Sequence, residues 1–183
     1  DLHLPGGDEK PMNVFGAHWD DHFARICADW RARVTEEDVV LIPGDISWAM
    51  QMKAAEPDLL AIASLPGRKV ILKGNHDYWW STAAKFRKFC EANGFTDMHI
   101  LNNNFFEYDG YAICGTRGWF FEEERSGQHD EKVFKRELIR LEASLKAAGE
   151  KPKMVFLHYP PRYKGYECGE ILELLRKYEV RRC

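Results

Sequence analysis

The tetrapeptide Gly74-Asn75-His76-Asp77 follows residues 69–73, a short β-branched and apolar run that is typical of a buried strand. An amide, an imidazole and a carboxylate in succession suit acid–base chemistry or metal ligation. Packing gives no reason to gather them, because each must be hydrogen-bonded or solvated. Open α/β sheets place their chemistry at the carboxyl ends of strands, and this stretch fits that position. The alternative is a structured turn held by a hydrogen-bonded asparagine.

Two further apolar runs are also followed by a side chain that can bind a metal ion or transfer a proton. Residues 39–42 lead through a Pro-Gly pair into Asp45, and residues 154–157 lead directly into His158. A carboxylate at a strand end can bridge two metal ions about 3.5–4 Å apart, although an aspartate there also forms turns or caps helices. A histidine that ends an apolar strand is either a site residue or a core histidine with satisfied hydrogen bonds.

Asp1 and His3 are two residues apart, so in an extended chain both side chains lie on one face and can hold the same cation. The tripeptide by itself is also compatible with a solvated chain end. Carboxylate and amide oxygens combined with imidazole nitrogens form a mixed ligand set. Such a set suits Mn²⁺, Fe²⁺ or Zn²⁺ better than Ca²⁺ or Mg²⁺, and it needs no thiolate.

The composition indicates one globular domain with a sizeable core. The chain has 183 residues, of which 45% are hydrophobic and 30% charged. Its net charge of -3 gives no reason to expect a nucleic acid as partner, and no apolar run is long enough to span a membrane. The five cysteines are odd in number and contain no CxxC pair, which favours reduced thiols in a cytoplasmic protein. The oligomeric state is not specified by these features.

Hydrophobic periodicity and turn residues predict the elements that position these side chains. Helices are expected over about 18–34, 57–64, 82–92, 131–148 and 170–178. Strands are expected over 39–42, 69–72, 98–101, 105–108, 111–114 and 154–157, with a further strand starting at 180–183. Pro57 is expected to begin its helix, Asp109-Gly110 predicts a hairpin, and residues 122–130 are expected to form an exposed loop.

In order along the chain, these residues resemble the signature of the calcineurin-like metallophosphoesterases, whose blocks read DxH, GD, GNH[D/E], H and GHxH. The first four blocks are matched by Asp1-Leu2-His3, Gly44-Asp45, Gly74-Asn75-His76-Asp77 and His158. The resemblance spans most of the chain. It implies an α/β fold in which two mixed β-sheets, flanked by helices, form a four-layer αββα sandwich.

Carried over position by position, the resemblance implies two divalent transition-metal ions, Mn, Fe or Zn. Asp1 and His3 would bind the first ion, Asp45 would bridge both, and Asn75 and His158 would bind the second. Phosphoester hydrolysis in this family proceeds by attack of a metal-bound hydroxide on phosphorus.

His76 has a different role in this scheme. The resemblance implies that it acts as a general acid towards the leaving oxygen, or stabilises charge in the transition state, without binding a metal.

The chain departs from the family pattern in two places. The terminal GHxH block is absent, and so is the apolar strand that normally precedes DxH. We therefore expect residues 1–183 to form a single metallophosphoesterase domain that is incomplete at both ends and retains metal weakly. The stretch after Gly44-Asp45 also lacks the Asp-Arg-Gly of protein Ser/Thr phosphatases and dinucleotide polyphosphate hydrolases, which favours the bacterial phosphodiesterase-type branch.

Aromatic and basic residues near these blocks suggest substrate contacts. Trp48 and Tyr78, with Trp79 and Trp80, are candidates for an apolar wall that receives a nucleobase or an acyl chain; packing of the loops over the sheet is the alternative. The aromatic stretch 119–121 has the same two interpretations. Arg117 would clamp a phosphate with its planar guanidinium or form a salt bridge.

The leading hypothesis is a dinuclear metallohydrolase that cleaves phosphomonoester or phosphodiester bonds of a small molecule. The alternative is a non-catalytic scaffold of the same fold that binds a protein partner. Intact His76 argues against that alternative, because its loss would be the simplest sign of an inactive site. A nuclease is a third possibility, which the net charge disfavours.

Overall fold

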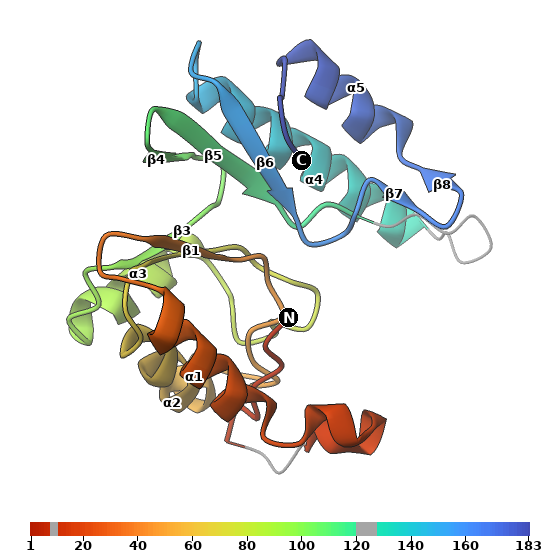
Figure 1. Ribbon diagram of the computed structural model, residues 1–183. Coiled ribbons are helices and arrows are strands. Elements are labelled where there is room, and N and C mark those ends of the chain that lie inside the picture. Colours follow the sequence, from red (N-terminus) through yellow and green to blue (C-terminus); the bar gives the residue numbers. More distant parts are fainter. Residues whose placement is uncertain (8–10, 120–127) are drawn as a thin grey trace. The chain divides into compact units, whose positions relative to one another are not determined.

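The computed structural model describes residues 1–7, 11–119 and 128–183 (Figure 1). The chain divides into two compact units, Asp1–Ile100 and Leu101–Cys183. Each unit contains a three-stranded sheet with helices packed against it. The mixed α/β class expected from the sequence is confirmed.

The first unit is built on parallel strands in the order β1-β2-β3. In the register of this sheet, Ile42 at the end of β1 lies beside Ile71, the last residue of β2. The loops that leave these two strands therefore start at the same edge. The elements of this unit are η1 (Met12–Phe15), η2 (Ala17–Trp19), α1 (His22–Arg33), β1 (Val39–Ile42), α2 (Met52–Ala63), β2 (Arg68–Ile71), α3 (Ala83–Ala92) and β3 (Met98–Ile100).

The core of the first unit forms where the helices meet this sheet. Leu59 and Ile62 of α2 and Phe86 of α3 are fully buried with Ile71 of β2. Their burial removes large apolar surfaces from water, at roughly 25 cal/mol per Å². The buried side chains of α2, α3 and β2 thus support the end of the sheet from which the two loops leave.

The second unit combines an antiparallel hairpin with a parallel pair. Its elements are β4 (Phe106–Tyr108), β5 (Tyr111–Thr116), α4 (Gln128–Ala147), β6 (Lys153–Leu157), β7 (Arg162–Tyr163), β8 (Tyr166–Glu167) and α5 (Gly169–Lys177). Asp109 and Gly110, both with positive φ, form the expected turn between β4 and β5. The strands β5 and β6 are parallel, and Thr116 at the end of β5 lies opposite Leu157.

Two helices in the first unit differ from the sequence prediction. Asp21 adopts a left-handed conformation with φ 48°, so α1 begins at His22 and not near residue 18. Pro57 lies inside α2, which already begins at Met52. Helix-forming residues precede this exposed proline, so the helix extends past it although Pro57 has no N–H to donate.

Three differences occur in the second unit. The helix expected at 131–148 begins at Gln128, and the rest of the predicted loop, residues 122–127, lies outside the described residues. The predicted strand at 180–183 is reduced to one parallel bridge between Met154 and Arg182. The β7–β8 hairpin was not expected, because its strands have only two residues each.

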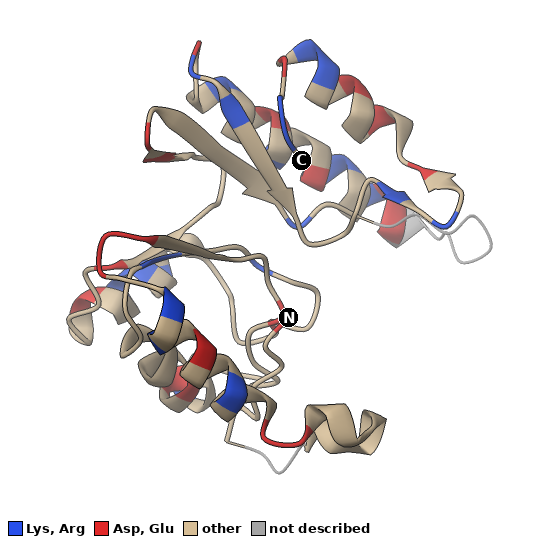
Figure 2. Ribbon diagram, viewed as in Figure 1, with Lys and Arg blue, Asp and Glu red and all other residues tan. Residues whose placement is uncertain are grey.

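Charged residues of both signs are interspersed along α1, α4 and α5 (Figure 2). All five cysteines are free, and Cys90, Cys114 and Cys168 are buried. Among the helices that the structure describes, none combines the length and apolarity that a membrane crossing requires.

Candidate metal centre

The loops after β1 and β2 approach each other so closely that only glycine fits at two positions. A Cβ atom added to Gly74 would lie 2.1 Å from Oδ1 of Asp45, and one added to Gly44 would lie 2.5 Å from the backbone nitrogen of Gly74. Gly44 has φ 107°, and Asp45 itself is left-handed with φ 51°. The Pro-Gly-Asp and Gly-Asn-His-Asp stretches therefore form one interlocked pair of loops.

The buried carboxylate of Asp77 holds this pair of loops together. Its Oδ2 accepts the backbone N–H groups of Asp45 at 2.8 Å and Gly74 at 2.7 Å. Its Oδ1 accepts the backbone N–H of Ile46 at 2.8 Å and the indole N–H of Trp79 at 3.0 Å. Burial raises the pKa of the Asp77 carboxyl, and the backbone donors act in the opposite direction. Asp77 thus fixes the backbone from which Asp45 projects.

Asp45 and His76 are in direct contact. The Nδ1 of His76 lies 2.7 Å from Oδ2 of Asp45, and the backbone N–H of His76 donates to Oδ1 at 2.9 Å. An ionised carboxylate only accepts, so Nδ1 of His76 carries the proton in this arrangement. The side-chain amide nitrogen of Asn75 lies beside the same ring, 3.1 Å from Nδ1 and 3.2 Å from Nε2. Asp45 is 4% exposed, whereas the His76 side chain is about one-third exposed.

The amino-terminal segment places His3 near the same carboxylate oxygen of Asp45 that His76 contacts. The backbone N–H groups of Leu2 and His3 both donate to the carbonyl of Asp45 at 2.9 Å. The Nε2 of His3 lies 3.9 Å from Oδ2 of Asp45, and its ring stacks on Trp48 with centroids 5.1 Å apart. Burial lowers the pKa of His3, and the Asp45 carboxylate acts in the opposite direction. A neutral imidazole is the form that ligates a metal.

The residues of the first unit fit a divalent transition metal. One ligand atom each of His3, Asp45 and His76 lies within 4.8 Å of the others, and carboxylate oxygens of Asp1 and Asp45 are equally close. Imidazole nitrogens with carboxylate oxygens are the donor set of such ions. The structure therefore places two of the predicted ligands, Asp1 and His3, close to a third, the Asp45 carboxylate. It also brings His76, which the sequence reading placed outside the metal shells, into this group.

His158 and Arg117 lie in the second unit, where they follow neighbouring parallel strands. Because Thr116 is paired with Leu157, both residues leave the sheet at the same edge. The backbone N–H of Tyr159 donates to the Arg117 carbonyl at 2.8 Å, which joins the two strand ends.

The Arg117 side chain forms the salt bridge that was one of its two predicted alternatives. Its Nη2 lies 3.4 Å from Oε1 of Glu137, and its guanidinium lies 4.7 Å from the centroid of the Trp119 ring. Glu137 is buried and also pairs with Arg140 at 2.6 Å.

The aromatic residues of the predicted wall separate into two groups. Trp79 and Trp80 are 2% and 6% exposed and pack against Phe86, so they belong to the core. Trp48 and Tyr78 lie beside His76 instead, with centroid distances of 4.6 and 6.2 Å. In the stretch 119–121, Trp119 packs edge-on to Tyr159, and Phe120 and Phe121 lie outside the described residues.

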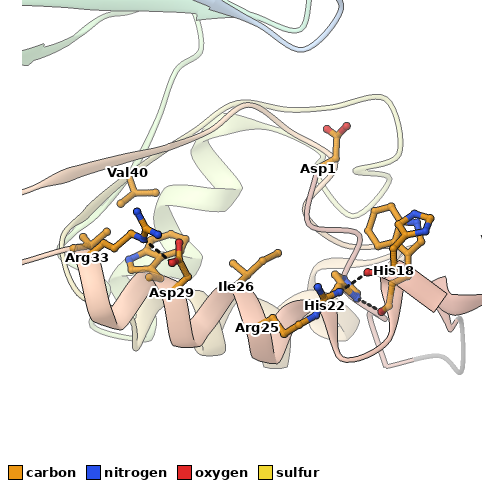
Figure 3. A pocket seen from close by; sticks show the side chains of 11 residues that line it. Asp1, His18, His22, Arg25, Ile26, Asp29, Arg33 and Val40 are labelled. Carbon is orange, nitrogen blue, oxygen red and sulfur yellow. Dashed lines mark hydrogen bonds and ion pairs between the residues drawn. The ribbon is translucent and has the colours of Figure 1, made fainter. Parts of the chain in front are cut away.

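A pocket of about 620 Å³ lies between α1 and β1 (Figure 3). Ile26, Trp30, Val34 and Val40 contribute apolar walls. Arg33 in its lining is paired with Asp29 at 2.6 Å, and Arg25 donates to backbone carbonyls. Asp1 and Trp19 belong to the pocket, but His3, Asp45 and His76 are not among its lining residues. The pocket therefore borders the candidate metal centre without containing it.

Two residues of the site were not assigned by sequence reasoning. Asp77 was visible as the last residue of the Gly-Asn-His-Asp block, but its hydrogen bonds to a loop 30 or more residues away cannot be derived from spacing. Trp19 falls inside the helix that the sequence predicts over about 18–34. It lies in η2, edge-on to His3 at 6.1 Å, and no sequence signal distinguishes this position from a core position.

Comparison with known proteins identifies the family. The sequence profile of the calcineurin-like phosphoesterases matches residues 1–183. Among solved structures, the chain is similar to a protein of unknown function from Aquifex aeolicus, with 18% identity and a TM-score of 0.46. That match covers 100% of this chain and 84% of the other. No curated protein matches the sequence. The profile match over the full length shows that the chain belongs to the calcineurin-like phosphoesterase family.

Proposed function

We propose that this protein hydrolyses phosphomonoester or phosphodiester bonds of a small molecule with the help of two divalent transition-metal ions, Mn, Fe or Zn. The observation that carries the proposal is the convergence of His3, Asp45 and His76 on one spot at the edge of a parallel sheet. Family membership supports it, because this family consists mostly of metal-dependent phosphoesterases.

The proposed ligands divide between two ions. Asp1 and His3 would hold one ion, Asp45 would serve both, and Asn75 and His158 would hold the other. When bound, the ions supply Lewis-acid chemistry, because they lower the pKa of a coordinated water and offset phosphate charge. We also propose that residues 1–183 belong to a single metallophosphoesterase domain, which the profile match over this range supports.

We assign His76 the role of the general acid that protonates the leaving oxygen. Its Nδ1 and its backbone N–H both contact the Asp45 carboxylate, so the ring is fixed in orientation. A protonated Nε2 would donate to the leaving oxygen as the phosphorus–oxygen bond breaks. The partial exposure of the ring is compatible with substrate access.

Substrate contacts are assigned to Arg117, Trp48 and Tyr78. Arg117 would bind a phosphate oxygen with the donors that Glu137 does not use. Interspersed charges and the net charge of -3 favour a small molecule over a nucleic acid. The five free cysteines support a cytoplasmic location.

The test is hydrolysis of p-nitrophenyl phosphate and bis-p-nitrophenyl phosphate by the full-length protein. Turnover should be lost after treatment with a chelator and return on addition of Mn²⁺. The preferred ester then distinguishes a monoesterase from a diesterase. A His76→Gln variant should bind Mn²⁺ but turn over at least about a hundredfold more slowly, given the usual size of a general-acid contribution. Metal binding without turnover of any ester would favour the non-catalytic scaffold.

A further inference from the structure

Five rings form a continuous row across the candidate metal centre. Trp19 lies 6.1 Å from His3, His3 lies 5.1 Å from Trp48, Trp48 lies 4.6 Å from His76, and His76 lies 6.2 Å from Tyr78, all measured between centroids. Aromatic residues thus alternate with the two histidines of the site, whose rings also lie 5.9 Å from each other. The row brings together residues from η2, the amino-terminal segment and both strand-end loops.

Packing does not explain this row. Trp80 stacks on Phe86 at 5.3 Å with the planes 6° apart, and both rings are buried in the core. Tyr78, only two residues before Trp80, is 54% exposed. Trp19 and Trp48 are partly exposed as well. Exposed apolar rings beside chemistry-bearing residues are typical of ligand sites.

The row is also held in place before any ligand arrives. The indole N–H of Trp48 points to Sδ of Met12 at 3.4 Å, and its ring is stacked on His3. Trp19 packs edge-on to His22 at 5.1 Å. A ligand that binds to rings already fixed loses little conformational entropy in ordering them.

We propose that this row, above all Tyr78 and Trp48, binds a planar aromatic group of the phosphoester substrate. The inference rests on the proposed function, because the phosphate of that substrate would lie at the metal centre. Stacking of a planar ring on an aromatic side chain is worth about 1–3 kcal/mol. A pair of aromatic rings gains about 0.5–1.5 kcal/mol beyond the area that it buries, an increment that an acyl chain does not receive. The substrate class is therefore an ester of an aromatic or heteroaromatic alcohol, or one that carries such a ring next to the phosphate.

The test compares ligands that share one head group and are not hydrolysed. Benzylphosphonate, cyclohexylmethylphosphonate and methylphosphonate are titrated calorimetrically into the Mn²⁺-loaded, full-length protein. Benzylphosphonate should bind about five- to tenfold more tightly than cyclohexylmethylphosphonate. In Tyr78→Leu this ratio should fall to about one, and Tyr78→Phe should restore it, because phenylalanine keeps the ring. Tyr108→Leu is the matched control: this exposed tyrosine lies on β4 beside the hairpin turn, and its loss should leave the ratio as in the wild type.

Equal binding of the benzyl and cyclohexylmethyl ligands would overturn the aromatic preference while leaving phosphoester hydrolysis intact. A ratio that persists in Tyr78→Leu would also overturn it. Failure of the proposed function would look different, because the protein would then neither bind methylphosphonate nor turn over either nitrophenyl ester.

Discussion

The Oδ2 atom of Asp77 accepts the backbone N–H of Asp45 at 2.8 Å, across 32 positions of sequence. This bond joins the loop after β1 to the loop after β2, and it fixes the left-handed backbone of Asp45. The candidate metal centre thus depends on the carboxylate of Asp77, which is fully buried. Asp77 is not one of the residues whose ligand atoms gather around Asp45.

Replacement of Asp77 by asparagine should destabilise the protein by about 2–3 kcal/mol, because the amide nitrogen would face N–H donors and leave them without an acceptor. The free energy of unfolding in urea measures this loss. Mn²⁺ affinity should fall as well, since Asp45 loses its support. The matched control is Asp38→Asn, a partly exposed aspartate whose Oδ2 accepts from Thr35, for which little change is expected. Equal losses in both variants would contradict the assigned role of Asp77.

Gly74→Ala should cost about 3 kcal/mol and disrupt metal binding, because its Cβ would lie 2.1 Å from Oδ1 of Asp45 and 2.2 Å from the Asp45 nitrogen. Thermal unfolding and Mn²⁺ titration measure the two effects. Gly169→Ala serves as control, since a Cβ there meets nothing within 4 Å. A Gly74→Ala protein with native stability would show that the loops are not as close as described.

The second unit has a comparable buried anchor in Glu137, which is 2% exposed. It accepts the Thr116 hydroxyl and pairs with Arg117 and Arg140. Glu137→Gln should destabilise the protein by about 3 kcal/mol, because two guanidinium groups lose their shared carboxylate. Glu131→Gln, which removes an exposed pair with Lys135 on the same helix, should change stability little. Urea unfolding of both variants distinguishes a buried from a surface role.

Stability should decrease as the pH falls below about 6.5, the ordinary value for histidine. Burial lowers the pKa of His99 on β3, with Asp97 acting in the opposite direction, and burial lowers that of His3 as well. The unfolded chain therefore binds more protons than the folded chain in this range, and protonation favours unfolding. The free energy of unfolding at pH 7.5 and pH 5.5 should differ less in His99→Gln than in the wild type. Identical differences would rule out His99 as a contributor.

Much of the strand and loop framework could be predicted from the sequence, because it depends on local patterns. The run 39–42 became β1 with unchanged bounds, and the Asp109-Gly110 turn formed as expected. The start of α1 could not be predicted, since it depends on the left-handed conformation of Asp21. Pro57 was misplaced because the helix-forming residues before it outweigh the single hydrogen bond that it removes.

In the candidate site, too, the residue types could be predicted from local sequence, whereas the contacts between distant segments could not. The types and the order of the residues in the Gly-Asn-His-Asp block were enough to predict a site for metal binding or acid–base chemistry. The contact of His76 with Asp45, by contrast, depends on the parallel register of β1 and β2. Similarly, neighbouring Tyr78 and Trp79 differ in exposure, 54% against 2%, because one faces the site and the other the core. Composition alone cannot separate them.

Metal-dependent phosphoester hydrolysis at Asp45 is tested by the rates at which the wild type and Asp45→Asn hydrolyse two esters, bis-p-nitrophenyl phosphate and p-nitrophenyl phosphate. Both rates are measured as a function of added Mn²⁺. Asp45 is the carboxylate on which His3 and His76 converge, and asparagine keeps its shape while removing its charge. We expect Mn²⁺-dependent turnover of at least one ester in the wild type and its loss in Asp45→Asn. Turnover that is independent of metal, or that persists in Asp45→Asn, would contradict it.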